Sequence, residues 1–300
     1  MGVSNRFILE QGPVIGTLAK GALDLALSKK KSKGERKALQ TPGPEVELRV
    51  PPRSKELLGA YCRHVGADKS AYRGFVPPHL FPQWVFPLQA KTLEGIPYPM
   101  EKVLNGGCRM EIHAPLPANE PLIVRGRLEN IDDNGRRALI HARATTGTKS
   151  VPEALSVDMY AVVPLRSKEK KKGPKKDKPR VPVNVQELAY WRIGSNAGLD
   201  FAKLTGDFNP VHWIPPYARA MGFRNVILHG FSTMARAYEG VVRSSLQGRP
   251  FRMRSFDVKF TRPLILPHEV GLYIDEEQGI YVGDAPGGPA YLVGSYGADK

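Results

Sequence analysis

Residues 201–230, FAKLTGDFNPVHWIPPYARAMGFRNVILHG, hold the candidate chemistry of this 300-residue chain and indicate its fold. Asp207 and His212 stand five residues apart in this stretch, on either side of Asn209 and Pro210. Because a proline lacks an amide donor and disfavours helical geometry at the preceding residue, the segment is predicted to be a fixed, irregular loop. Such a loop can point a carboxylate and an imidazole at one spot, where the pair can hold or release a proton near neutral pH.

A helix is predicted over residues 231–246, directly after Gly230. The first amides of that helix, at Gly230 and Phe231, have no partner within the helix and form a positive end suited to a developing oxyanion. Since glycine has no side chain, Gly230 lets such an oxygen approach the backbone closely. His229 precedes it and is expected to make a structural contact at the helix start, with a role as a second base as the alternative.

The whole string resembles the signature of the MaoC-like, hydratase-2 family of hotdog-fold enzymes. The family pattern is an aromatic, an aliphatic and a small residue, then Gly-Asp-x-Asn-Pro, an aliphatic, His and a further small residue. The matching residues here are Phe201, Leu204, Thr205, Gly206, Asp207, Asn209, Pro210, Val211, His212 and Ala218. The chain departs from the family after the histidine, where Trp213 stands in place of a small polar residue.

The resemblance implies (R)-specific hydration of trans-2-enoyl-CoA to (R)-3-hydroxyacyl-CoA, or the reverse dehydration. It also implies that Asp207 and His212 activate the water and move the α-proton, and that Gly230 offers its amide to the thioester carbonyl. Phe231 is expected to add its amide to that site. Asn209 is expected chiefly to hold the loop and secondarily to orient the dyad formed by Asp207 and His212.

An internal repeat predicts that the hotdog unit occurs twice. Residues 108–124 and 256–274 each contain an alternating strand, Pro-Leu, a proline-containing turn and a second alternating strand. A helix ending in Leu-Glu-Gly or Tyr-Glu-Gly is predicted upstream of each Pro-Leu. The predicted fold is therefore α+β, a double hotdog with two antiparallel sheets, each wrapped around a central helix. Because residues 63–72, RHVGADKSAY, lack the dyad string, the first copy is predicted to be degenerate.

The chain is predicted to contain four segments. They are an N-terminal extension with a basic tract (1–45), a degenerate hotdog domain (46–165), a basic flexible linker (166–182) and a catalytic MaoC-like hotdog domain (183–300). Strands are predicted at 122–131, 137–145, 154–165, 183–188, 251–261, 269–275 and 290–295. A helix is predicted at 84–94, with Pro87 in its first turn. Residues 13–27 are expected to form a helix packed on the body or, alternatively, a membrane-surface helix.

The formal net charge of +15 comes mostly from two tracts, residues 29–37 and 166–180. These lysines lack interleaved aromatic residues for base stacking, so no specific nucleic acid is expected as a partner, only weak contact with an anionic surface. The expected partner is an acyl-CoA or acyl-carrier-protein thioester. Basic residues near the loop are candidates for contact with its nucleotide or phosphopantetheine arm: Arg252, Arg254, Lys259 and Arg262.

Other chemistries are disfavoured by the composition. The two cysteines, Cys62 and Cys108, form no CxxC pair, and the histidines lack metal-ligand spacing, so neither a metal nor a cofactor is expected. No apolar run approaches the roughly 20 residues of a membrane span, and a cytoplasmic monomer or homodimer is expected. His64 and Asp68 are not expected to form a second site.

Three functions compete on the sequence alone. The first is hydration or dehydration of acyl-CoA, with a 3-hydroxyacyl-carrier-protein dehydratase as a close variant. A hotdog thioesterase would not need the Gly-Asp-x-Asn-Pro-x-His string, so the sequence counts against it. The third is a non-catalytic hotdog that binds acyl thioesters and is tethered through its basic tracts.

Overall fold

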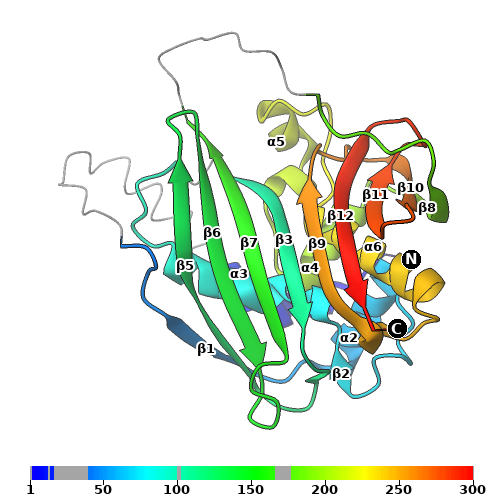
Figure 1. The fold of residues 1–300 in the computed structure, drawn as a ribbon. Coiled ribbons are helices and arrows are strands. Elements are labelled where there is room, and N and C mark those ends of the chain that lie inside the picture. Colours follow the sequence, from blue (N-terminus) through cyan, green and yellow to red (C-terminus); the bar gives the residue numbers. More distant parts are fainter. Residues whose placement is uncertain (1, 13, 17–39, 100–102, 166–176, 300) are drawn as a thin grey trace.

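Ten strands form one antiparallel sheet in the computed structural model, which describes residues 2–12, 14–16, 40–99, 103–165 and 177–299 (Figure 1). The strand order is β1-β5-β6-β7-β3-β9-β12-β11-β10-β8. The strands of the first half are β1 (Val46–Val50), β3 (Leu104–Ile112), β5 (Leu122–Asp133), β6 (Arg137–Gly147) and β7 (Leu155–Pro164). Those of the second half are β8 (Gln186–Ile193), β9 (Met253–Phe260), β10 (His268–Ile274), β11 (Gly279–Gly283) and β12 (Ala290–Ala298). A separate pair joins β2 (Phe75–Val76) to β4 (Leu116–Pro117).

The sheet is arranged as two copies of one five-strand unit. β3 and β9 pair at its centre, with Met110 opposite Phe256, and each half then follows the same sequence of strands outward to an edge. The repeat found at residues 108–124 and 256–274 therefore corresponds to the β3–β5 and β9–β10 segments. The predicted double hotdog is confirmed, but its two predicted sheets are joined into one, because β3 pairs with β9.

The helices lie together on one face of the sheet (Figure 1). Their bounds are α2 (Lys55–Val65), α3 (Pro82–Thr92), α4 (Ala197–Thr205), α5 (Pro215–Ala220) and α6 (Gly230–Ser245), with 3-10 turns η1 (Asn5–Gln11), η2 (Pro78–Leu80), η4 (Pro210–His212) and η5 (Pro250–Arg252). α3 and α6 occupy corresponding positions in the two halves. α6 buries residues around most of its circumference, because the sheet covers one side and α2 packs against another.

Several predicted boundaries differ from the structure. The helix predicted at 84–94 starts earlier, with Pro82 in the first helical position, where a missing amide costs little, and Pro87 consequently lies in the second turn. The strand predicted at 183–188 is β8, displaced so that Trp191 pairs with Val270 of β10. Gly240 lies inside α6 and does not end it. β11 was not predicted.

The N-terminal segment docks beside α4. Gln11 is fully buried, and its side-chain amide donates to the Leu204 carbonyl and accepts from Gln83 Nε2 at 2.9 Å. The amide of Val3 donates to Asp200. Most of the helix predicted at 13–27, the basic tract at 29–37 and most of the linker at 166–182 lie outside the described residues. Among the helices of the described ranges, none has the length and apolar character needed to span a membrane.

A buried polar network joins the two halves. The Glu239 carboxylate of α6 accepts from Tyr72 at 2.6 Å and from His79 Nε2 at 2.7 Å, and Tyr61 reaches His79 Nδ1 at 2.9 Å. Each of the four side chains is less than 5% exposed. Glu239 comes from the second half, and the other three residues come from the first. A buried carboxylate is stable only where such partners replace water. The network therefore fixes how α6 sits against the first half.

Replacing Glu239 with Leu should lower the free energy of unfolding by about 3–5 kcal/mol, because His79 and Tyr72 lose their buried acceptor. Urea denaturation measures this change. Glu269→Leu is the matched control, since the Glu269 side chain is 54% exposed, and its effect should stay within about 0.5 kcal/mol. Equal effects of the two substitutions would contradict a role for the network.

Candidate active site

The loop that carries Asp207 begins where α4 is terminated by Gly206. Gly206 has φ +83, the left-handed conformation that favours glycine, and its amide donates to the Ala202 carbonyl at 2.7 Å. A Cβ at this position would lie 2.6 Å from the Cβ of Val14, so the N-terminal segment also closes over the turn. The chain leaves the helix at this point, as predicted for an irregular loop.

Asn209 holds the second part of the loop. Its side-chain oxygen accepts from the amide of Val211 at 3.3 Å and caps η4, and its own amide donates to Asp207 Oδ1 at 3.3 Å. These contacts are the loop-holding role expected for Asn209. The turn that follows brings His212 back toward Asp207.

His212 presents one free ring nitrogen to the site. Its Nδ1–H donates to the Ile227 carbonyl at 2.8 Å, which leaves Nε2 with its lone pair. The ring stacks on that of His229, with centroids 3.6 Å apart and planes 26° apart. His212 is therefore held in one tautomer and one orientation, as a general base requires.

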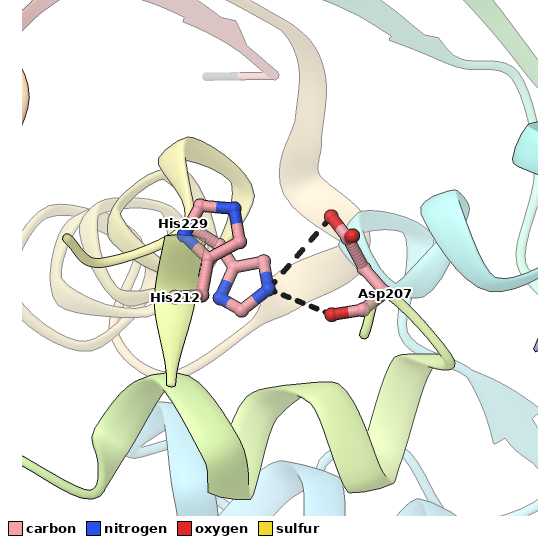
Figure 2. A group of neighbouring side chains, drawn as sticks. All are labelled: Asp207, His212 and His229. Atoms are coloured by element: carbon pink, nitrogen blue, oxygen red, sulfur yellow. Dashed lines mark hydrogen bonds and ion pairs between the residues drawn. The ribbon is translucent and has the colours of Figure 1, made fainter. Parts of the chain in front are cut away.

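His229 connects the start of α6 to the dyad loop. Its Nε2–H donates to the Asp207 carbonyl at 2.9 Å and lies 3.7 Å from Asp207 Oδ2 (Figure 2). The side chain is 1% exposed. The structural contact expected at the helix start is present, and the structure also brings His229 into the group formed by Asp207 and His212.

Burial sets the charge state of the two histidines. It lowers the pKa of His212 below the ordinary 6.5, although the Asp207 carboxylate and the hydrogen bond to Ile227 each act to raise that pKa. Burial and the neighbouring His212 lower the pKa of His229 to about 3, again against Asp207. Both imidazoles are consequently neutral at pH 7, and His212 can accept a proton there.

The backbone at the start of α6 lies next to this group. Gly230 follows His229, and a Cβ on it would lie 2.9–3.0 Å from the Phe260 ring. The amides of Gly230 and Phe231 precede the first internal bonds of the helix. The Phe231 side chain is buried against Phe81 and Phe86 of the first half, so its ring packs away from the loop and only its amide is placed for an oxyanion.

Asp207, His212 and His229 each bring a ligand-type atom within 4.8 Å of the others, and such a group could hold a metal ion. The orientation argues for acid–base chemistry instead. The lone pairs of two stacked imidazoles lie in nearly parallel planes and cannot converge on one ion, and His229 Nε2 and His212 Nδ1 already donate to carbonyls. The absence of a metal remains a prediction.

The remaining candidates from the sequence are scattered. Arg252 and Arg254 bond to Asp299, at the opposite end of β9 from Phe260 and Gly230. Arg262 lies beyond the near end of β9 but bonds to the carbonyls of Pro179 and Ala290. Asp68 is exposed and bonds to Ser70, so it does not pair with His64.

Trp213 has a role that the sequence analysis missed. Its indole N–H donates to the Phe208 carbonyl at 3.1 Å, and the two rings meet edge to face. This bond joins the two ends of the segment 208–213 and so closes the loop that carries Asp207 and His212. The departure from the family pattern at Trp213 was the available signal in the sequence.

The fold is shared with solved structures. A conserved hypothetical protein of Mycobacterium tuberculosis with a double hotdog fold aligns at a TM-score of 0.55, with 15% identity over 86% of this chain and 96% of that one. The class of protein is therefore a double hotdog. Residues 171–284 match the family model described as MaoC like domain. This match lies in the second half of the chain and covers somewhat over a third of its length.

Two curated relatives extend the similarity. A protein of Mycobacterium tuberculosis named 3-hydroxyacyl-thioester dehydratase X is 28% identical over 201 residues, which cover 65% of this chain and 68% of that protein. Enoyl-CoA hydratase 2, peroxisomal, of Arabidopsis thaliana is 27% identical over 190 residues, covering 56% and 58%. The matched stretches thus span from somewhat under three fifths to two thirds of these relatives' own length.

Asp207→Asn should lower the pKa of His212 further, because the carboxylate raises that pKa by stabilising the imidazolium. A pH titration of the histidine ring signals by NMR measures the shift. Asp284→Asn serves as the control, since Asp284 pairs with the distant His268 at 2.8 Å. A His212 pKa that rises in Asp207→Asn would show that the carboxylate does not act on this ring.

Proposed function

We propose that this chain hydrates trans-2-enoyl thioesters to (R)-3-hydroxyacyl thioesters, or catalyses the reverse dehydration, with CoA as the carrier. The observation that carries the proposal is the convergence of the Asp207 carboxylate, the free Nε2 of His212 and the first amides of α6. The match of residues 171–284 to the MaoC like domain model supports it. So do the names of the relatives, a 3-hydroxyacyl-thioester dehydratase and an enoyl-CoA hydratase.

In the proposed reaction, a water is held between the Asp207 carboxylate and His212 Nε2. As the water oxygen bonds to C3 of the enoyl group, one water proton passes to this acid–base pair. The electron pair of the double bond moves onto the thioester oxygen, where the amides of Gly230 and Phe231 stabilise the charge. The pair then returns a proton to C2, so the elements of one water are added and the protein is restored.

The acyl chain has an apolar surface beside this point. Phe231 and Phe260 of the second half meet Phe86 of the first half, and Phe86 is only partly buried. Both halves therefore contribute to the surface next to Gly230, where the acyl chain would lie. Carrier-protein thioesters are the alternative substrates, and a non-catalytic acyl-thioester-binding module is the alternative function.

Asp207→Asn and His212→Ala should each reduce the rate of hydration of trans-2-enoyl-CoA by on the order of 10²- to 10⁴-fold. Loss of enoyl-thioester absorbance, measured with substrates of graded length, follows the reaction, and chiral analysis of the product tests the (R) configuration. The variants His268→Ala and Asp284→Asn are matched controls, because they alter a second His–Asp pair whose side chains are 32% and 39% exposed. Wild-type protein inactive on both CoA and carrier-protein thioesters would leave only the binding module.

The acid limb of kcat/KM should lie below pH 6.5. His212 must be neutral to accept a proton, and burial lowers its pKa from 6.5, so the active form persists as the pH falls and is lost only below that lowered pKa. A pH–rate profile measures the limb. In Asp207→Asn the residual activity should keep its acid limb at still lower pH. A wild-type limb above pH 7 would exclude His212 as the base.

A further inference from the structure

Four buried side-chain atoms in the described part of the chain have no hydrogen-bond partner in the protein, and they gather behind the dyad. They are His64 Nε2, His229 Nδ1, Ser232 Oγ and Arg236 Nε. The spacing of four residues puts Ser232 and Arg236 on one face of α6, and His229 is the residue that precedes the helix. His64 comes from α2, and the ring of Phe201 contacts both His64, at 6.0 Å, and His229, at 4.9 Å.

These atoms form a polar column with an outer and an inner end. Arg236 and His64 are partly exposed, whereas Ser232 and His229 are 0% and 2% exposed. Among the described residues, Arg236 has no carboxylate within ion-pair distance. At the inner end, His229 stacks on His212 and contacts Asp207 (Figure 2). The column therefore runs from the partly exposed His64 and Arg236 to the residues that contact Asp207 and His212.

Leaving a buried polar group without a partner is unfavourable, and native proteins supply such groups with ordered water. The chemistry of the column suits water in particular. His229 donates through Nε2, so its Nδ1 can only accept, whereas Arg236 Nε can only donate. Water does both, and the hydroxyl of Ser232 lies between them on the helix face. An anion would satisfy the arginine but not the histidine.

We propose that this face of α6 is a path along which the reacting water exchanges with bulk solvent while the acyl thioester occupies the site. The inference rests on the proposed function, because hydration consumes a water at the dyad and dehydration releases one there. The acyl chain and the water then use different sides of α6. Phe231 faces the apolar cluster with Phe86 and Phe260, and the polar column runs along the side that faces α2.

Incorporation of ¹⁸O from solvent into the substrate distinguishes exchange of water along this path from the rate of the catalysed reaction. A 3-hydroxyacyl-CoA is incubated in H₂¹⁸O with the full-length protein, while an enoyl reductase removes released enoyl-CoA. Mass spectrometry then gives the ratio of ¹⁸O entering the remaining 3-hydroxyl to enoyl-CoA released. In the wild type the eliminated water should exchange with bulk before the enoyl-CoA leaves, so that ¹⁸O enters faster than product departs.

Ser232→Val should lower this ratio about fivefold or more, the equivalent of one lost hydrogen bond of about 1 kcal/mol in the path. The released water is then returned to the substrate without exchange. Thr233→Val is the matched control, because the Thr233 hydroxyl already bonds to the His229 carbonyl at 3.5 Å and is not part of the column. Its ratio should equal that of the wild type. Because both quantities in the ratio follow the same elimination step, a substitution that only slows that step leaves the ratio unchanged.

Arg236→Met tests the outer end if Ser232→Val fails to fold, and it should lower the ratio in the same direction. Two results would overturn the path: wild-type ¹⁸O entry no faster than enoyl-CoA release, or an unchanged ratio in both Ser232→Val and Arg236→Met. A wild type that turns over neither CoA nor carrier-protein substrates would contradict the proposed function itself, and the path with it.

Discussion

The hydrogen bond from His229 to the carbonyl of Asp207 is the interaction on which the arrangement of the site depends. It joins two segments 22 residues apart, the dyad loop and the start of α6. Because His229 is the residue before Gly230, the same bond sets where the free helix amides lie relative to the carboxylate. Because its ring supports that of His212, it also fixes the imidazole. Carboxylate, imidazole and amides are thus positioned by one buried side chain.

The two halves share a fold but contribute different parts of the structure around the site. The second half contributes the loop of Asp207 and His212 and the helix that begins beside it. The first half has lost that loop and contributes packing instead: Phe86 beside the start of α6, His64 behind it and His79 against Glu239 further along. α6 is accordingly apolar toward one neighbour and polar toward another. A helix with so little solvent-facing surface must find partners for every polar group it carries.

The sequence predicted the double hotdog and the irregular loop between Gly206 and His212, because both follow from local patterns. Alternation and the Asp-Asn-Gly turn identified the hairpin of β5 and β6, and the proline after Asn209 identified the loop. The contacts of His64, Arg236 and Glu239 could not be predicted, since they depend on how α2 packs on α6 across more than a hundred residues of sequence. The start of β8 was misplaced for a related reason: pairing with β10 fixes its register.

The central pairing of β3 with β9 has a consequence for how the protein exists in solution. If the two halves were separate chains, β3 and β9 would each be an edge strand with unpaired backbone N–H and C=O groups, and such edges tend to pair with other chains. Covalent linkage makes the meeting of the two edges intramolecular, so that it proceeds at a high effective concentration set by the connecting segment. The joined sheet therefore does not come apart on dilution, as a pair of separate subunits would. Fusion of the repeats has made the integrity of the site independent of how much protein is present.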